Sequence, residues 1–132
     1  MESPLTQISL EMVRARSASW TISVMTVDAN GCPVGADITL STPVFTARAT
    51  QFSTTALFTK TVGAGLTVIA TNPGVLRLDL VPADTAFLSP AFPIALSDSW
   101  WVELDISFPG GLQYTAAAGW LRFSPFSPGP TS

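Results

Sequence analysis

Residues 74–80, Gly-Val-Leu-Arg-Leu-Asp-Leu, are the stretch of sequence that decides the fold. The valine and the leucines of this stretch straddle Arg77 and Asp79, so apolar and charged side chains alternate. Successive side chains of a β-strand point to opposite faces of a sheet, and this period of two therefore predicts a strand with one buried face. The turn signal Asn72-Pro73-Gly74 stands directly before it.

The same alternation recurs on both sides of this stretch, and Gly, Asn and Pro interrupt it every 8–12 residues or so. We expect further strands at residues 8–12, 20–28, 37–41, 44–48, 57–62, 66–70, 100–108 and 112–123. Many short strands separated by turns are typical of a sandwich or barrel. The sequence therefore predicts an all-β fold, an immunoglobulin-like antiparallel β-sandwich of about seven to nine short strands.

One segment has a different pattern. Residues 82–88 begin with a proline that the first turn of a helix tolerates, and Pro90 and Pro93 exclude a longer helix. We expect at most one helical turn there, crossing from one sheet to the other. The domain is expected to span residues 1–123, with residues 1–7 as a candidate N-terminal arm, and residues 124–132 form a proline-rich C-terminal arm.

Composition excludes several classes of function. The 132 residues include six Lys and Arg against nine Asp and Glu, so no basic surface for nucleic acid is expected. The absence of His removes the commonest general base, and Cys32 alone cannot form a zinc site or an internal disulfide. We expect a non-enzymatic protein with no catalytic residues, no metal and no other cofactor.

Targeting signals are also sparse. The first ten residues contain no Lys or Arg, and no window approaches about 18 consecutive apolar residues. We therefore expect cytoplasmic synthesis, without a cleavable secretory signal or a membrane-spanning helix.

Two carboxylates are spaced for a shared face. Glu103 and Asp105 are two residues apart in an expected strand, so both point to one side of the sheet. A solvated face explains them better than a catalytic pair, since isolated carboxylates carry little information about chemistry. Cys32, next to the turn signal Asn30-Gly31, is interpreted as a small buried or rim residue rather than a nucleophile.

The aromatic residues are the candidates for binding. Trp100 and Trp101 are adjacent, so one faces the core and the other faces outward. Phe123 and Phe126 lie at the C-terminal arm, where they are positioned to dock on a neighbouring subunit. Interfaces favour Trp and disfavour Lys, and the chain has four Trp and a single Lys. We take these four aromatic residues as interface candidates, with sugar stacking on the outward Trp as the alternative.

Five segments together resemble a known family. They are residues 27–34 (Val-Asp-Ala-Asn-Gly-Cys-Pro-Val), 58–62 (Phe-Thr-Lys-Thr-Val), 74–85, 101–106 (Trp-Val-Glu-Leu-Asp-Ile) and 114–125. Their order resembles the small immunoglobulin-like domain at the N-terminus of upper-baseplate and related tail proteins of tailed bacteriophages. Leu-x-Leu-x-Pro-Ala-Asp-Thr, followed by a late Gly-x-Leu-x-Phe strand, is the distinctive part.

The resemblance implies a building block of a virion. We expect a structural protein of a tailed bacteriophage, present in multiple copies as a tail or baseplate adaptor or as a capsid decoration. Its expected partners are other virion proteins and copies of itself, with no nucleic acid and no membrane, and its location is the virion. Larger members continue into host-binding regions that this sequence lacks, so receptor binding does not carry over. The alternative is a carbohydrate-binding module that recognises host surface glycans.

Overall fold

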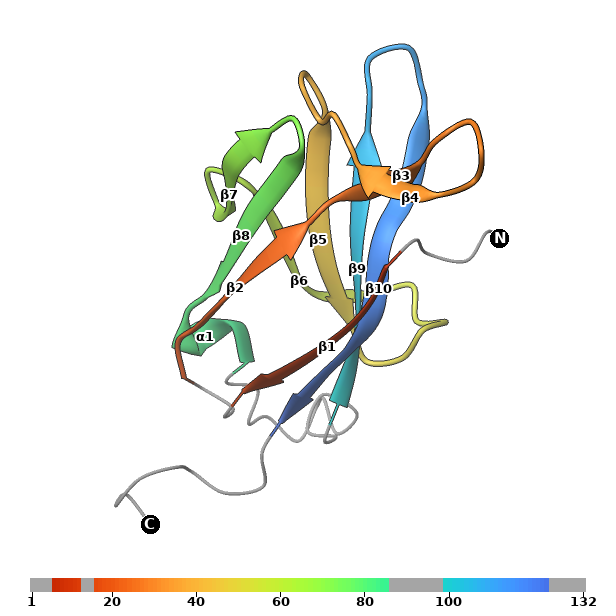
Figure 1. Cartoon of the computed structure of the whole chain (residues 1–132). Helices are drawn as coiled ribbons and strands as arrows, with labels where there is room; N and C mark the ends of the chain where they lie inside the picture. Colours follow the sequence, from red (N-terminus) through yellow and green to blue (C-terminus); the bar gives the residue numbers. More distant parts are fainter. Residues whose placement is uncertain (1–5, 13–15, 86–98, 124–132) are drawn as a thin grey trace.

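The computed structural model describes residues 6–12, 16–85 and 99–123, and most of them are in strands (Figure 1). In chain order the elements are β1 (Thr6–Met12), β2 (Ala18–Ser23), β3 (Met25–Val27), β4 (Pro33–Gly35), β5 (Thr42–Arg48), β6 (Ala56–Val62), β7 (Gly65–Thr71), β8 (Gly74–Leu80), α1 (Pro82–Thr85), β9 (Ser99–Ser107) and β10 (Gln113–Phe123). The all-β expectation and the single helical turn are both confirmed.

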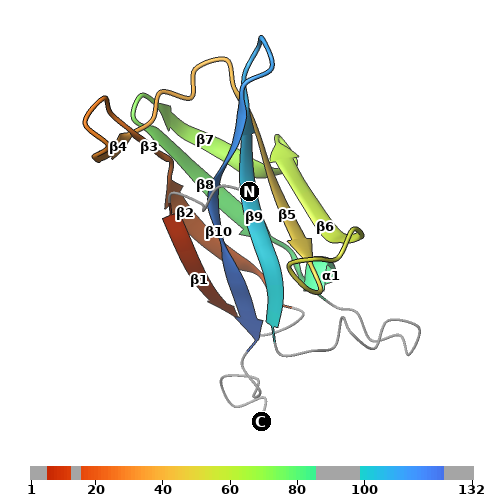
Figure 2. The ribbon, with the colours of Figure 1, turned by 90° about the vertical axis from the view of Figure 1, so that its right-hand side faces the viewer.

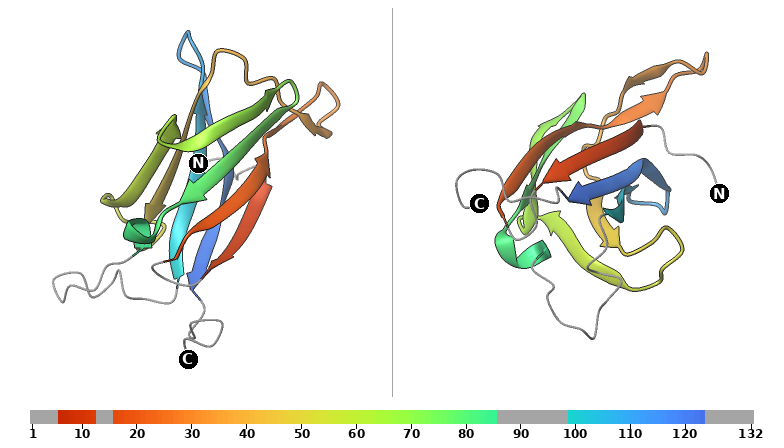
Figure 3. Two further views of the ribbon diagram at one scale, coloured as in Figure 1. Left: turned by 90° about the vertical axis from the view of Figure 1, so that its left-hand side faces the viewer. Right: turned by 90° about the horizontal axis from the view of Figure 1, so that it is seen from below.

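Eight strands follow one another in the order β1-β10-β9-β5-β6-β7-β8-β2. The order folds over where β6 meets β7, so that β1, β10, β9, β5 and β6 form the larger layer and β7, β8 and β2 the smaller one (Figures 2 and 3). In the letters of the immunoglobulin fold, β2, β8 and β7 correspond to strands B, E and D, and β10, β9, β5 and β6 correspond to strands G, F, C and C′. The two layers therefore have the strand order of variable-type immunoglobulin sandwiches. The sandwich expectation is therefore confirmed.

Two details differ from the expectation. The described residues form ten strands instead of about seven to nine, because residues 20–28 divide into β2 and β3, and β3 pairs with the short β4 in a separate hairpin. The sheet is also not purely antiparallel, since β1 runs parallel to β10 from Thr6 to Met12. Residues 6 and 7 are therefore part of a strand instead of an arm, and residues 1–5 and 124–132 lie outside the described residues.

The core lies between the two layers and follows from strand alternation. In β8 the side chains of Leu76, Leu78 and Leu80 are buried while Arg77 is exposed, as the opening stretch predicts. In β9 every second residue from Trp100 to Ile106 is fully buried. Burial of this kind contributes about 1.5–3 kcal/mol for each large apolar side chain and is the main stabilising term of the sandwich.

Residues 37–41 do not form the expected strand. Asp37 accepts hydrogen bonds from the backbone N–H of Thr39 at 3.0 Å and from its hydroxyl at 2.6 Å, which favours a turn. Leu40 then has a φ of 65° and is 82% exposed. The apparent alternation of Ile38 and Leu40 is therefore misleading, because Ile38 is buried and Leu40 points into solvent.

Helix α1 leads from the smaller layer towards the larger one. It is tied to β6 by the chain's single lysine, since Lys60 Nζ lies 2.9 and 2.8 Å from the two carboxylate oxygens of Asp84. Asp84 also accepts a hydrogen bond from the backbone N–H of Val81 at 2.8 Å, which closes the first turn of the helix. This ion pair holds α1 against β6 of the larger layer.

Candidate functional site

The outward face of β9 carries the side chains that the sequence singles out. Trp101, Glu103 and Asp105 alternate with buried residues and point away from the core. Trp100, by contrast, is fully buried and packs edge-to-face on Phe123, with ring centroids 4.8 Å apart. The prediction that the two adjacent tryptophans face opposite sides is confirmed, and Trp101 is the outward one.

The interface candidates are thus divided by the fold. Trp100 and Phe123 belong to the core, since Phe123 is only 8% exposed, so neither offers a surface for docking in this structure. Trp101 remains available on the outer face. Phe126 lies outside the described residues. Phe123 is buried because it continues the inward row of β10, so the expectation that it docks on a neighbouring subunit is not met in this structure.

Trp120 joins Trp101 on the outer face. The two residues are direct cross-strand neighbours in the β9–β10 register, and their rings are 5.2 Å apart with an angle of 79° between the planes. Such edge-to-face pairs add about 0.5–1.5 kcal/mol beyond the area that they bury. Trp120 was not among the predicted site residues, although the alternation of β10 places it outward. Its position next to Trp101 depends on the register between β9 and β10, which the sequence of neither strand determines.

Glu103 is held by two partners. Its Oε1 accepts a hydrogen bond from the indole Nε1–H of Trp101 at 2.8 Å, and its Oε2 lies 3.4 Å from Nη1 of Arg48 on β5. The side chain is 15% exposed, so the expectation of a solvated face is wrong for this residue. A carboxylate in this arrangement is fixed in position and neutralised, which suits recognition better than proton transfer.

Asp105 is half-buried on the same face. Burial raises the pKa of its carboxyl above the ordinary value, the hydroxyl of Thr115 lowers this pKa by donating a hydrogen bond of 2.7 Å, and the nearby Glu103 carboxylate raises it. Arg48 has a smaller lowering effect on the pKa. The two carboxylates do share a face, as predicted, but each already has its own hydrogen-bond donor.

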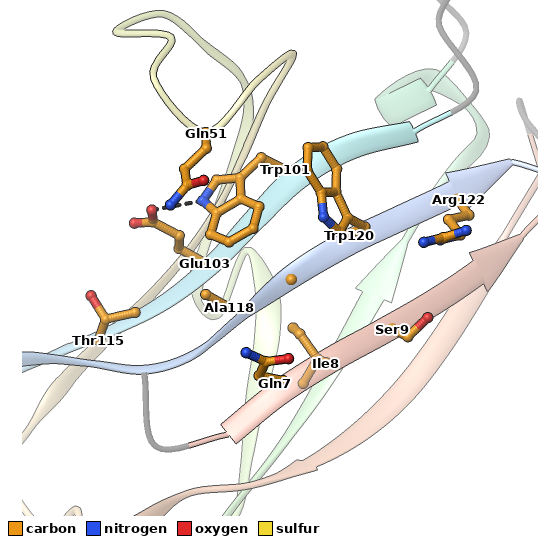
Figure 4. A pocket seen from close by; sticks show the side chains of 11 residues that line it. Gln7, Ile8, Ser9, Gln51, Trp101, Glu103, Thr115, Ala118, Trp120 and Arg122 are labelled. Atoms are coloured by element: carbon orange, nitrogen blue, oxygen red, sulfur yellow. Dashed lines mark hydrogen bonds between the residues drawn. The ribbon is translucent and has the colours of Figure 1, made fainter. Parts of the chain in front are cut away.

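A hollow of about 430 Å³ opens beside the two indoles. Figure 4 shows it between the tryptophan pair and strand β1, with Ala118 between Glu103 and Gln7. We call it the tryptophan hollow. Its lining residues are Gln7, Ile8, Ser9, Gln51, Trp101, Glu103, Thr115, Ala118, Gly119, Trp120 and Arg122.

No protein-family model matches the chain, and a search of the curated proteins finds no significant match.

A second feature lies at one end of the sandwich. The hairpin of residues 25–35, the turn of residues 39–42 and the turn of residues 108–112 lie together there, at the top of Figure 1. We call this region the loop end. It carries four exposed large apolar residues, namely Val27, Val34, Leu40 and Leu112.

The loop end is anchored to the sandwich by backbone hydrogen bonds. Val24 N–H donates to the carbonyl of Gly74 at 2.9 Å, Gly74 N–H donates to that of Ala36, and Ile38 N–H donates to that of Thr71 at 2.8 Å. Asp28 fixes the hairpin turn, since its side chain accepts from the N–H groups of Asn30 and Cys32. The apolar side chains are therefore presented on fixed backbone.

Other chemistry finds little support in the part of the chain that the structure describes. Cys32 is a free and exposed thiol in the hairpin turn, so of the two expected positions, buried or at the rim, the buried one is wrong. Within residues 6–12, 16–85 and 99–123, no group of three or more His, Cys, Asp or Glu is placed to hold a metal ion. No helix in those ranges is long and apolar enough to cross a membrane.

Proposed function

We propose that this protein is a non-enzymatic structural subunit that assembles in multiple copies, as a tail or baseplate adaptor or a capsid decoration of a tailed bacteriophage. The assignment to a virion is supported by the sequence motifs at residues 74–85 and 114–125 and by the immunoglobulin-like strand order. The assignment to assembly is supported by the loop end.

Leu40 is the observation that carries the proposal. Its side chain is 82% exposed, and its backbone has a φ of 65°, a conformation that costs a non-glycine residue about 1–2 kcal/mol. Exposure of a bulky apolar side chain and a left-handed backbone both oppose the folded monomer. A role in contact with another protein accounts for a leucine at such a position.

The neighbouring residues extend this surface. Leu112 is 65% exposed and Val27 is 49% exposed, and both lie on hairpins that reach the same end of the sandwich. The carboxylates of Asp28 and Asp37 lie in the same loops, where each accepts hydrogen bonds from its own turn, and the whole chain has only 11% charged residues. Four exposed large apolar side chains at one end of the sandwich match the apolar composition of interface centres.

The experiment measures the mass of the whole chain by light scattering across a range of concentrations. We expect the average mass to rise with concentration, and we expect the double variant Leu40→Asn/Leu112→Asn to stay at the monomer mass. A control is Val62→Thr/Ile69→Thr, which removes two apolar residues on β6 and β7 that are 51% and 54% exposed, and which keeps the association. A wild-type chain that remains monomeric at every concentration contradicts assembly from copies of itself.

The virion assignment has a separate test. The protein, expressed during phage growth, is expected to sediment with purified particles and to be released from them by denaturant. Its absence from purified particles, in a preparation where it is abundant in the lysate, contradicts this assignment.

A further inference from the structure

We propose that the tryptophan hollow binds a saccharide ring. The site is independent of the loop end, since Trp101 lies near the start of β9 and the turn of residues 108–112 follows the end of that strand. At about 3.3 Å per residue the two features are roughly 20 Å apart. A ligand in the hollow and a partner at the loop end are therefore compatible.

The apolar part of the site comes from the two indoles. Their planes are 79° apart, so Trp101 and Trp120 form a corner instead of a flat surface (Figure 4). Next to this corner the register places Ala118 between Glu103 of β9 and Gln7 of β1. Ala118 lines the hollow with a short side chain that is only 3% exposed, so it forms the floor of the hollow between these two residues.

The polar part of the site surrounds that corner. Six lining residues carry polar side chains from three strands and the β5–β6 loop, namely Gln7, Ser9, Gln51, Glu103, Thr115 and Arg122. The carboxylate of Glu103 is held in place by Trp101 and Arg48, so it is a preorganised acceptor. Small-ligand sites combine an apolar lining with a few fixed polar groups in this way, in volumes of about 300–1,000 Å³.

A pyranose fits these features because it is amphipathic. One face of the ring presents C–H groups, which pack on an indole, and the edge of the ring presents hydroxyls that both donate and accept hydrogen bonds. Amide, carboxylate and hydroxyl side chains match those hydroxyls in kind. The volume of about 430 Å³ accommodates such a ring.

A proline-rich peptide is the rival occupant, since aromatic grooves also bind such segments. A peptide of this kind offers mostly carbonyl acceptors and therefore requires donors from its receptor. The fixed polar group here, Glu103, only accepts. Its charge is balanced by Arg48 at 3.4 Å, and Arg122 is exposed at the rim, so the charges favour a neutral or acidic sugar over a cationic ligand.

The test titrates the whole chain with methyl β-D-glucopyranoside, with its uronic acid counterpart and with sorbitol, an open-chain polyol without a ring face. Amide chemical shifts and tryptophan fluorescence report binding. We expect saturable changes at β9 and β10 with a Kd on the order of 1–10 mM for at least one glycoside, and none for sorbitol. If the protein prefers the uronic acid glycoside and Arg122→Gln removes this preference, the ligand is an acidic sugar. If the protein binds the glucoside and the uronic acid glycoside equally, the ligand is a neutral sugar.

Two variants place the ligand in the hollow. Trp120→Ala removes half of the corner, and Ala118→Leu fills the space above the sheet while all polar groups remain. We expect each to weaken binding at least ten-fold. The matched control is Trp20→Phe, a change at a half-buried tryptophan of β2 outside the hollow, which leaves the affinity unchanged.

Three outcomes overturn the proposal. The first is that neither glycoside binds saturably, and the second is that glycoside and sorbitol give equal responses. The third is that Trp20→Phe loses binding while a folded Ala118→Leu variant retains it. Titration with a peptide of residues 124–132 is the remaining arm. Saturable binding of this peptide at the hollow, with no response to the glycosides, assigns the site to a proline-rich segment instead of a sugar.

Discussion

At the scale of single residues, Leu40 combines a left-handed backbone conformation with a side chain that disfavours it. A glycine adopts its φ of 65° without steric cost, whereas leucine pays a strain of about 1–2 kcal/mol. We predict that Leu40→Gly raises the free energy of unfolding of the monomer by about 0.5–1 kcal/mol, because relief of strain exceeds the added entropy of the unfolded chain. Chemical denaturation at a concentration where the chain is monomeric measures this change.

Leu112 provides the matched control for that change. It is exposed to a similar extent, but its φ is not in the left-handed region. Leu112→Gly is therefore expected to lower the free energy of unfolding by about 0.5–1 kcal/mol through chain entropy alone. Equal destabilisation by the two glycine variants contradicts the strain assigned to Leu40.

Asp105 gives the protein a pH dependence of unusual sign. Burial raises the pKa of its carboxyl in the folded state above the unfolded value, so the folded protein binds the proton more tightly. The stabilising effect of this group is present at acidic pH and is lost as the pH rises through the raised pKa. We predict that Asp105→Asn raises the free energy of unfolding at pH 7 by less than about 1 kcal/mol, which thermal unfolding measures as a higher unfolding temperature. The gain is expected to disappear near pH 3.

Asp79 is the control of opposite sign. Its pKa is lowered, first by a hydrogen bond of 2.7 Å from the hydroxyl of Ser19 and then by Arg77. Its stabilising effect is therefore present at neutral pH and is lost as the pH falls through the lowered pKa. Thermal unfolding of Asp79→Asn should show a small loss at pH 7 that vanishes in acid, and a gain at pH 7 would contradict this assignment.

The candidate site was only partly predictable from its residues. The adjacency of Trp100 and Trp101 was enough to predict that one of them faces outward. Which one does so depends on the register of the core, and the pairing of Trp101 with Trp120 depends on how two strands far apart in sequence align. The same holds for Glu103, since alternation places it outward while its burial comes from Arg48 on another strand.

At the scale of elements, Gly119 determines whether β1 can join the sheet. A Cβ atom at this position would overlap the carbonyl oxygen of Ile8, its partner in the parallel β1–β10 register. Because that oxygen belongs to the backbone, β1 must move as a whole, which exposes Leu10 and Met12. We predict that Gly119→Ala lowers the free energy of unfolding by about 2 kcal/mol or more.

Amide hydrogen exchange is the measurement suited to this change. Loss of protection in residues 7–12, with protection retained in β8 and β9, is the expected result. Ser9→Ala is the control on the same strand, since this side chain is exposed and its truncation should change the free energy of unfolding by less than about 0.5 kcal/mol. Unchanged exchange of β1 in Gly119→Ala would contradict the close approach of the two backbones.

Strands were predictable where alternation coincides with a continuous partner. Strand β8 is paired along its length with β2 and β7, and its pattern predicts it almost to the residue. Residues 20–28 also alternate, but the chain changes partners after Ser23 and leaves the sheet to pair with β4. Alternation indicates which side chains of a strand are buried, but it does not indicate which other strand pairs with it. The division of residues 20–28 into β2 and β3 could therefore not be predicted.

At the scale of the whole molecule, the strand order has two ends. Strands β1 and β2 each pair on one side only among the described residues, and a groove of about 400 Å³ lies between them. Neither β1 nor β2, with 7 and 6 residues, carries an exposed large apolar side chain among the described residues, whereas the loop end carries four. We therefore expect association from the loop end, and its apolar character determines how association responds to salt.

The chain has a net charge of −3, so copies repel one another weakly, and the proposed contact through Leu40 and Leu112 is apolar. Salt shortens the screening length from about 30 Å at 0.01 M to about 8 Å at 0.15 M, which weakens the repulsion and leaves the apolar attraction intact. We predict that self-association, measured by sedimentation velocity, strengthens over this range of ionic strength. Leu40→Asn/Leu112→Asn should remain monomeric at every salt concentration, because screening alone supplies no attraction. Association that instead weakens steeply with salt would require a contact between opposite charges and would exclude the loop end as the interface.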